Sequence, residues 1–307
     1  FQDKSYEIDK PAVMNLKNKK WISVSIVVLA SALLCMGAFA RGKKEVENKS
    51  LSRIVSLSPA GTETLFALGL GDLLVARTDF CNYPPEALSV NSLGGFDGKT
   101  FSLESVLAFN PGLVYLDVTM HGHLTDNLQN LGIQVFETNI ASLDDIYKEI
   151  RELALLFDIK QRAEELITTI QRAYTPMPLA DMQTISLDTE NEYAKVYWEV
   201  WNAPYMSVGS SSFINDVIRE AGAINIFSDI AAAYPVVSEE SIIARNPSLI
   251  LLPADSPENW ESLSKRTGWQ SIDAIQNKKV IKIDGDLISR PGPRIGEAIR
   301  AVQEALQ

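Results

Sequence analysis

The stretch SLESVLAFNPGLVYL, residues 102–116, returns almost unchanged 136 positions later as SEESIIARNPSLILL, residues 238–252. Without a gap, the two copies are identical at eight of fifteen positions, and most of the others exchange one apolar residue for another. In each copy a serine can cap a short helix, a glutamate lies in the first turn, and a proline ends the helix before an apolar strand. The sequence therefore predicts the same helix–turn–strand unit in two similar halves of the chain.

Strands and helices alternate on both sides of each copy. RIVSL at 53–57 is typical of a buried strand, and Ser58 followed by Pro59 is typical of the start of a helix, here one that ends at Gly69. Such alternation predicts an α/β fold with mostly parallel sheets covered by helices. Further strands are expected at 73–77, 113–116, 133–136, 193–200, 249–252 and 279–283, and further helices at 123–131, 143–157, 160–174, 213–221, 269–275 and 293–306.

A helix is predicted to connect the two halves. Between Lys160 and Tyr174 apolar residues recur at helical spacing over about four turns, roughly 22 Å at about 1.5 Å per residue. Pro176 and Pro178 end this helix. The predicted organisation is an N-terminal α/β lobe at 51–157, one long connecting backbone helix at 158–178 and a C-terminal α/β lobe at 179–307.

The first 50 residues have the composition of a leader. A basic stretch from Met14 precedes a 14-residue uncharged run at 21–34, which is short for a bilayer span and typical of a signal peptide. Two processing routes stay open, cleavage after Ala40 or lipid modification of Cys35. A retained leader would anchor the same exported domain. We therefore expect a signal region at 1–40, a charged linker at 41–50, and export to the periplasm or cell surface.

Composition excludes several classes of function. Without residues 1–40 the chain has 23 Lys and Arg against 36 Asp and Glu, a net charge of −13 that repels nucleic acid and anionic lipid. Cys81 is the only cysteine after residue 40, so we expect no internal disulfide and a small buried side chain. The sequence lacks the CxxC, HExxH, GxSxG and P-loop patterns, and nothing in it indicates an enzyme.

Five stretches carry a family resemblance. In this order, RIVSLSPAGTETLFALGLGD, YPPEA, LESVLAFNPGLVYL, VSEESIIARNPSLILL and SRPGPRI resemble the substrate-binding proteins of ABC importers for vitamin B12, iron–siderophores and haem, in which a single helical backbone joins the lobes. The resemblance covers about residues 51–307 and is closest to the cobalamin-binding branch through DFCNYPPEA and GGFDGKTFSLESV. It implies a cleft between the lobes for cobalamin or a related corrinoid, with an iron–siderophore or haem as the alternative. It further implies a monomer without cofactor that delivers its ligand to a dimeric permease with an ATPase.

The repeated glutamates have two interpretations. In the cobalamin-binding proteins one glutamate of each lobe docks on arginines of the permease, and the matching residues are Glu104 and Glu240. The alternative is structural, because a carboxylate in the first turn of a helix stabilises it by about 0.3–1 kcal/mol.

Ligand contacts are expected beyond the carboxyl ends of the strands, where open α/β sheets bind their ligands. A corrin is a broad, mostly apolar disc fringed by amides, so flat aromatic side chains should dominate affinity. The resemblance puts Phe96 and Tyr234 in the places of two wall tryptophans and Tyr83 in the place of the tyrosine of the YPP loop, while a third wall falls near Asp117, where the chain departs from the pattern. Ordinary loop packing is the alternative. The candidate ligand-binding residues are Ser58, Pro59, Tyr83, Phe96, His121, His123, Trp201, Tyr205, Tyr234, Asp286, Arg290 and Arg294.

The histidines and arginines suggest more specific contacts. In an extended segment His121 and His123 would point to one side. One of them could then be an axial ligand of iron or cobalt, or both could hold a divalent metal with Asp117. Exposed loop histidines are the alternative, and since the C-terminal lobe has no histidine, we expect no site for a free metal ion. Arg290 and Arg294 could pair with carboxylates or phosphate of a ligand, or be structural. A rival of another class is an envelope hydrolase with a metal on His121, His123 and Asp117.

Overall fold

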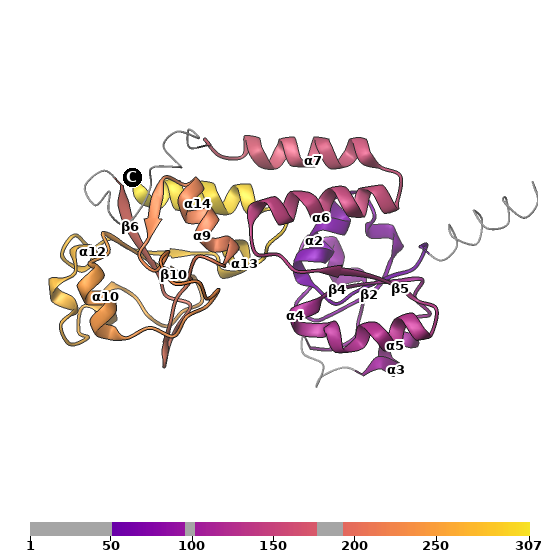
Figure 1. Cartoon of the computed structure of the whole chain (residues 1–307), viewed down its shortest axis with the longest axis horizontal. Coiled ribbons are helices and arrows are strands. Elements are labelled where there is room, and N and C mark those ends of the chain that lie inside the picture. Colours follow the sequence, from indigo (N-terminus) through magenta and orange to yellow (C-terminus); the bar gives the residue numbers. More distant parts are fainter. Residues whose placement is uncertain (1–50, 96–101, 177–192) are drawn as a thin grey trace, which may run out of the picture. The chain divides into compact units, whose positions relative to one another are not determined.

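The computed structural model describes residues 51–95, 102–176 and 193–307, and residues 50–307 form one compact unit (Figure 1). The predicted leader with Cys35, the predicted linker and Phe96 lie outside the described residues. Within these three ranges, no helix combines the length and the apolar character that a bilayer span requires. The predicted limits of the lobes at 157 and 179 stay predictions, because residues 177–192 are not described.

The first sheet has the strand order β3-β2-β1-β4-β5, and every pairing between its neighbours is parallel. Its central strands are buried on both faces, which explains their continuous apolar runs. The strands are β1 (Ile54–Ser56), β2 (Leu74–Arg77), β3 (Asn91–Ser92), β4 (Leu113–Asp117) and β5 (Gln134–Thr138).

The second sheet repeats the order of the first. Its order is β11-β10-β6-β9, again with parallel pairings, so that β9-β6-β10-β11 corresponds to β2-β1-β4-β5. The predicted α/β class with two mostly parallel sheets is confirmed. The strands are β6 (Ala194–Trp198), β9 (Ala223–Asn225), β10 (Leu249–Pro253) and β11 (Val280–Ile283), and β7 (Trp201–Asn202) pairs with β8 (Tyr205–Met206) in a separate antiparallel ribbon.

The sequence repeat is a structural repeat. Ser102 caps α3 (Leu103–Leu107) by accepting a hydrogen bond from the N–H three residues later, and Ser238 caps α10 (Glu239–Arg245) in the same way. In each case the serine at the N-cap position explains why the helix begins at the next residue.

The two repeated helices also end alike. Asn110 and Asn246 have φ values of 45° and 44°, in the left-handed region that asparagine tolerates better than most residues. After each asparagine the proline prevents further helix, and the chain enters β4 or β10. The predicted helix–turn–strand unit is therefore present in both halves.

The remaining helices agree with most of the predicted ranges. Two predictions need correction: the helix expected at 123–131 starts at Thr125, and the one expected at 269–275 is divided into a 3₁₀ turn and a short α-helix at Ile272, whose backbone is extended. The α-helices are α2 (Pro59–Ala67), α4 (Val118–His121), α5 (Thr125–Asn130), α6 (Leu143–Leu156), α7 (Lys160–Arg172), α9 (Phe213–Glu220), α11 (Trp260–Leu263), α12 (Asp273–Gln276), α13 (Gly285–Ser289) and α14 (Ile295–Leu306).

One hydrophobic core runs through α6, α7, α9 and α14 and onto one face of each sheet (Figure 1). The connecting helix α7 packs on α6 and on α14. A Cβ atom added at Gly296 of α14 would lie 2.2 Å from the carbonyl oxygen of Ile170, so glycine permits this close helix–helix approach. Further clusters cover the other faces of the sheets, and Trp198 is buried in the main core.

Candidate functional site

Two adjoining cavities lie where the strands of the two sheets end. The first, of about 290 Å³, lies at the carboxyl ends of β1, β4 and β5, and the second, of about 460 Å³, at those of β6, β10 and β11. Both are lined by Asp286 and Ser289 of α13. The first is lined by Ser58, Pro59, Ala60, Phe80, Tyr115, Asp117, Thr138, Ile140, Glu149, Asp286, Ser289, Arg290 and Pro291, and the second by Trp198, Val200, Ile214, Tyr234, Pro253, Ala254, Asp255, Asp284, Gly285, Asp286 and Ser289.

The helix start after β1 forms part of the first cavity. Ser58 caps α2 by accepting a hydrogen bond from Gly61 N at 3.2 Å, and Pro59 is the first helical residue. The Tyr115 ring lies directly against this turn, because a Cβ atom added at Gly61 would be 2.0 Å from the ring. Gly61 therefore permits the position of Tyr115 in the cavity wall.

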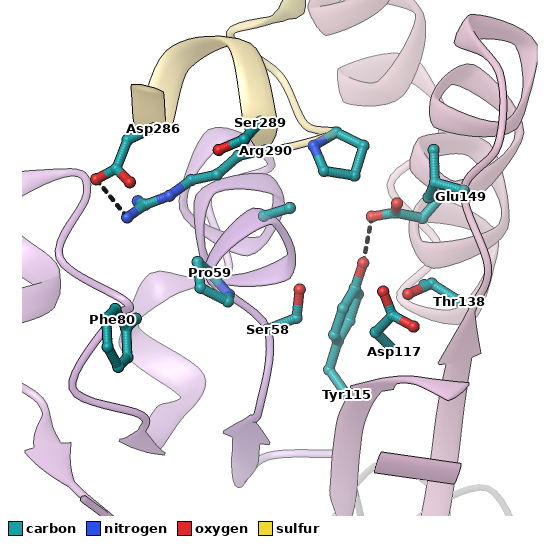
Figure 2. Close-up of a pocket in the computed structure, with 13 residues that line it drawn as sticks. Ser58, Pro59, Phe80, Tyr115, Asp117, Thr138, Glu149, Asp286, Ser289 and Arg290 are labelled. Atoms are coloured by element: carbon teal, nitrogen blue, oxygen red, sulfur yellow. Dashed lines mark hydrogen bonds and ion pairs between the residues drawn. The ribbon is translucent and has the colours of Figure 1, made fainter. Parts of the chain in front are cut away.

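Tyr115 points at a buried carboxyl group. Its hydroxyl donates a hydrogen bond of 2.6 Å to Oε1 of Glu149 on α6 (Figure 2). Burial, and then the charge of Glu149, raises the pKa of Tyr115, which remains a donor at neutral pH. Glu149 is 4 % exposed, and its Oε2 has no hydrogen-bond partner among the described residues.

The environment of Glu149 favours its protonated form. Burial raises the pKa of Glu149 to about 7, against the lowering effect of the hydrogen bond from Tyr115, and the charges of Asp117 and Glu152 raise it further. At neutral pH about half of the molecules carry the carboxylate. This titratable group forms part of the wall of the first cavity.

Carboxyl groups dominate the charge of the cavity lining. Among the described residues that line the two cavities, Arg290 is the only lysine or arginine. The carboxyl groups belong to Asp117 and Glu149 in the first cavity, Asp255 and Asp284 in the second, and Asp286 in both.

Arg290 and Arg294 both bind Glu63 of α2, a contact between segments more than 220 residues apart. Arg294 donates to both oxygens of Glu63 at 2.7 Å, and Arg290 donates to Oε1 at 3.0 Å. Arg290 also donates to Asn82 at 2.8 Å and to Asp286 at 2.5 Å. Glu63 is 2 % exposed, so this cluster is structural. Of the two arginines only Arg290 also lines a cavity.

Of the described aromatic candidates, Tyr234 lines a cavity and the others do not. Tyr234, which is 46 % exposed, lines the second cavity. Tyr83 instead lies under Arg294, with the guanidinium carbon 3.9 Å from the ring centroid. Trp201 is 61 % exposed on the β7–β8 ribbon, and Tyr205 donates to Glu239 at 3.2 Å. The described lining of the two cavities includes neither Trp201 nor Tyr205.

The histidines differ from expectation. The prediction of an extended segment is wrong, because Asp117 caps α4 by accepting a hydrogen bond from Thr119 N at 2.7 Å, so the chain turns into a helix directly after β4. His121 ends α4 and is buried, whereas His123 is exposed in the following 3₁₀ turn, and neither is among the described lining residues. Within the described ranges, no group of three or more His, Cys, Asp or Glu side chains could hold a metal ion, so His121, His123 and Asp117 do not form the metal site on which the hydrolase alternative was based.

Glu104 and Glu240 occupy equivalent, exposed places in the first turns of α3 and α10. A hydrogen bond with Ser102 lowers the pKa of Glu104. Both side chains are therefore accessible to a partner, and both also lie where the helix dipole favours a carboxylate.

The sequence analysis did not identify four residues of this region, although a sequence pattern pointed to three of them. Phe80 lies in the quoted stretch DFCNYPPEA, and Glu149 is a charged residue on the buried face of α6, between Ile146 and Leu153 at helical spacing. Glu63 is likewise a carboxylate in a helix whose neighbours are buried. Tyr115 left none, because its place in a buried apolar strand is indistinguishable from core packing. Cys81 is free and buried, as expected.

Comparisons with known proteins agree with this architecture. The uncharacterized ABC transporter substrate-binding lipoprotein YvrC of Bacillus subtilis is 29 % identical over 267 residues, which cover 84 % of this chain and 81 % of the relative. The vitamin B12-binding protein of Vibrio parahaemolyticus is 26 % identical over 259 residues, which cover 84 % and 90 %. Among solved structures, the periplasmic haem-binding protein RhuT of Roseiflexus superposes with a TM-score of 0.68 at 26 % identity and covers 83 % of this chain and 99 % of its own.

A family model supplies the assignment. The model described as periplasmic binding protein matches residues 54–287, a range that includes both sheets and all but the last residues of the two cavities. The repeated unit, the two parallel sheets and the cavities at their carboxyl edges all lie within this match. The chain belongs to the periplasmic binding protein family.

Proposed function

We propose that this protein is the exported substrate-binding component of an ABC importer and that it captures a bulky metal chelate, with cobalamin or a related corrinoid as the first candidate. The observation that carries the proposal is the pair of adjoining cavities at the carboxyl edges of both sheets, which meet at Asp286 and Ser289. A ligand that contacts both cavities must be large. The relatives named as vitamin B12-binding proteins support the corrinoid, and an iron–siderophore or haem is the second candidate.

Aromatic side chains supply the apolar contacts in this proposal. Tyr234 from the second cavity and Phe80 from the first are both largely accessible to a ligand. A tyrosine buries about 150–250 Å² in all. The exposed part of Tyr234 then offers roughly 100 Å², or about 2.5 kcal/mol at about 25 cal/mol/Å² as an upper bound. Phe96 stays a proposed ligand contact. Tyr83, Trp201 and Tyr205 also stay proposals, and because the described cavity linings do not include them, their contact with a ligand would require closure or loop movement.

The experiment is a ligand titration of the purified protein with cyanocobalamin, dicyanocobinamide, haemin and a ferric siderophore, followed by tryptophan fluorescence. Trp198 lines the second cavity and should report occupancy there. We expect binding of a corrinoid at micromolar concentration or below. Absence of corrinoid binding at that concentration would reject the first candidate, and binding of haemin or the siderophore alone would select the second.

The partners and the location belong to the same proposal. We expect a permease dimer and its ATPase as partners, a monomeric binding protein, and a leader at 1–40 that directs export. Intact mass of the exported protein separates the two processing routes, because cleavage after Ala40 leaves an unmodified chain, whereas modification at Cys35 adds acyl chains. Catalysis is not part of the proposal, since the matched relatives are named as binding proteins.

A further inference from the structure

Glu149 is held by the protein at one oxygen only. Tyr115 donates to Oε1 at 2.6 Å, whereas Oε2 finds no hydrogen-bond partner within the described part of the chain. The residue is 4 % exposed and lines the first cavity. A buried acceptor without a donor is unfavourable, and native structures rarely leave one without a reason. Oε2 is itself buried, so a donor group on a molecule in the cavity would reach it after a small rotation of the carboxyl group and would then remove this deficit.

The same lobe contains a buried glutamate with a structural role, and it differs from Glu149 in this respect. Both oxygens of Glu63 accept hydrogen bonds from Arg294, and Oε1 also accepts one from Arg290. The negative charge and both oxygens of Glu63 are therefore paired within the protein. Glu149 has a hydroxyl at one oxygen and an open cavity beside it (Figure 2).

The surrounding charges favour particular ligands. Figure 2 shows Tyr115, Asp117 and Glu149 on one side of the first cavity, and Asp286 and Arg290 on the other. The charge of Arg290 is already shared between Glu63 and Asp286. An anionic group placed in this cavity would be repelled by the carboxylates of the lining. Amide N–H, hydroxyl or ammonium groups would instead donate hydrogen bonds to these carboxylates.

We infer that Glu149 is a ligand-recognition residue whose free oxygen accepts a hydrogen bond from an N–H or O–H group of the bound chelate. The first cavity thereby selects neutral or cationic ligands with peripheral amides or amines and disfavours those with peripheral carboxylates. This inference rests on the proposed function and narrows its ligand class. A corrinoid with its amides fits the lining, and haem with its two carboxylates does not.

The test compares Glu149→Gln with the wild type and with Glu152→Gln, a matched control on the same helix whose side chain is exposed and outside the cavity lining. Glutamine can keep the bond from Tyr115 through its oxygen, and it then turns an NH₂ group toward the ligand donor. At pH 8 we expect Glu149→Gln to bind cyanocobalamin at least about tenfold more weakly, since a hydrogen bond to a charged group is lost. Glu152→Gln should bind like the wild type. Equal affinity of all three proteins would overturn the inference.

Changes in the ligand provide a second arm that does not depend on the fold of a variant. Monocarboxylic acid derivatives of cyanocobalamin, in which one peripheral amide is hydrolysed, are titrated into the wild type at pH 8. At least one of them should bind about tenfold or more weakly than the parent, and Glu149→Gln should reduce that discrimination. Uniform affinity across the derivatives contradicts the inference.

The two proposals fail in different ways. If the wild type binds haemin and no corrinoid, the proposed first ligand is wrong. The role of Glu149 is then tested by comparing the haemin affinity of Glu149→Gln with that of the wild type. Tighter binding of haemin by Glu149→Gln than by the wild type would still support discrimination against carboxylates by Glu149. Unchanged haemin affinity would overturn the inference as well.

Discussion

Replacement of Glu149 by glutamine should change how the stability of the unliganded protein depends on pH. The ordinary pKa of a glutamate is 4.5, and burial raises that of Glu149 to about 7 in the folded protein. Because the folded state binds this proton more tightly than the unfolded state, the stability contributed by the neutral carboxyl is fully present below pH 4.5. It is lost as the pH rises through about 7.

The magnitude follows from the gap between the two pKa values. At about 1.4 kcal/mol per pH unit, the gap corresponds to about 3 kcal/mol of unfolding free energy that the wild type loses between pH 4.5 and pH 8. Glutamine does not titrate and can keep the hydrogen bond from Tyr115. We therefore expect Glu149→Gln to become progressively more stable than the wild type across this range, by about 3 kcal/mol at pH 8.

The assay is urea denaturation of both proteins and of Glu152→Gln at pH 5, 6, 7 and 8, without ligand. Only the difference between variant and wild type is interpreted, because the other carboxylates titrate equally in both. The control should stay close to the wild type at every pH, because Glu152 is exposed and its charge has the smallest effect on the pKa of Glu149. A difference between Glu149→Gln and wild type that stays constant from pH 5 to pH 8 would refute the reasoning, because it would mean that the carboxyl group titrates as if in water.

Three further experiments test the docking surface, the buried ion pairs and the helix packing. Charge reversal of both Glu104 and Glu240 to arginine should abolish ligand uptake by cells but leave ligand affinity unchanged, as measured by transport and titration; normal uptake would contradict docking. Glu63→Gln should lower the unfolding free energy by about 3–5 kcal/mol, because it removes the buried carboxylate shared by the buried Arg290 and the partly buried Arg294, and an effect below about 1 kcal/mol would argue against the buried cluster. Gly296→Ala should cost about 1–3 kcal/mol through its clash with the α7 backbone, whereas Gly122→Ala, whose nearest contact is 3.6 Å away, should be neutral.

Local features of the chain were predictable, because local chemistry determines them. In the repeat, the serine caps determine where α3 and α10 begin, and the left-handed asparagines and the prolines stop the helical stretch that follows. The spacing of apolar residues predicts the ends of α6 and α7 to within two residues. The division near Ile272 was missed because an apolar residue with extended backbone fits a helical pattern equally well.

The site was less predictable, because its chemistry depends on contacts between distant segments. Strand ends could be named as the ligand edge, and Ser58, Pro59, Tyr234, Asp286 and Arg290 do line the cavities. The sequence does not, however, indicate that two arginines near residue 290 meet a glutamate more than 220 positions earlier.

The histidine segment shows the same limit on a smaller scale. Asp117 accepts hydrogen bonds from the backbone N–H and the hydroxyl of Thr119 and so caps α4, in which His121 is buried, while His123 is exposed in the 3₁₀ turn that follows. The prediction assumed an extended chain, in which every second side chain points to the same side, and this geometry does not apply to His121 and His123.

The ionic cluster of Glu63 has a consequence for binding kinetics. Glu63 belongs to the first helix of one lobe, and its two arginines flank the segment after α13, so a single carboxylate fixes the spacing between the elements that line the first cavity. A site that is preorganised in this way loses little conformational entropy when a ligand arrives. Differences in affinity between ligands should then appear mainly in their dissociation rates.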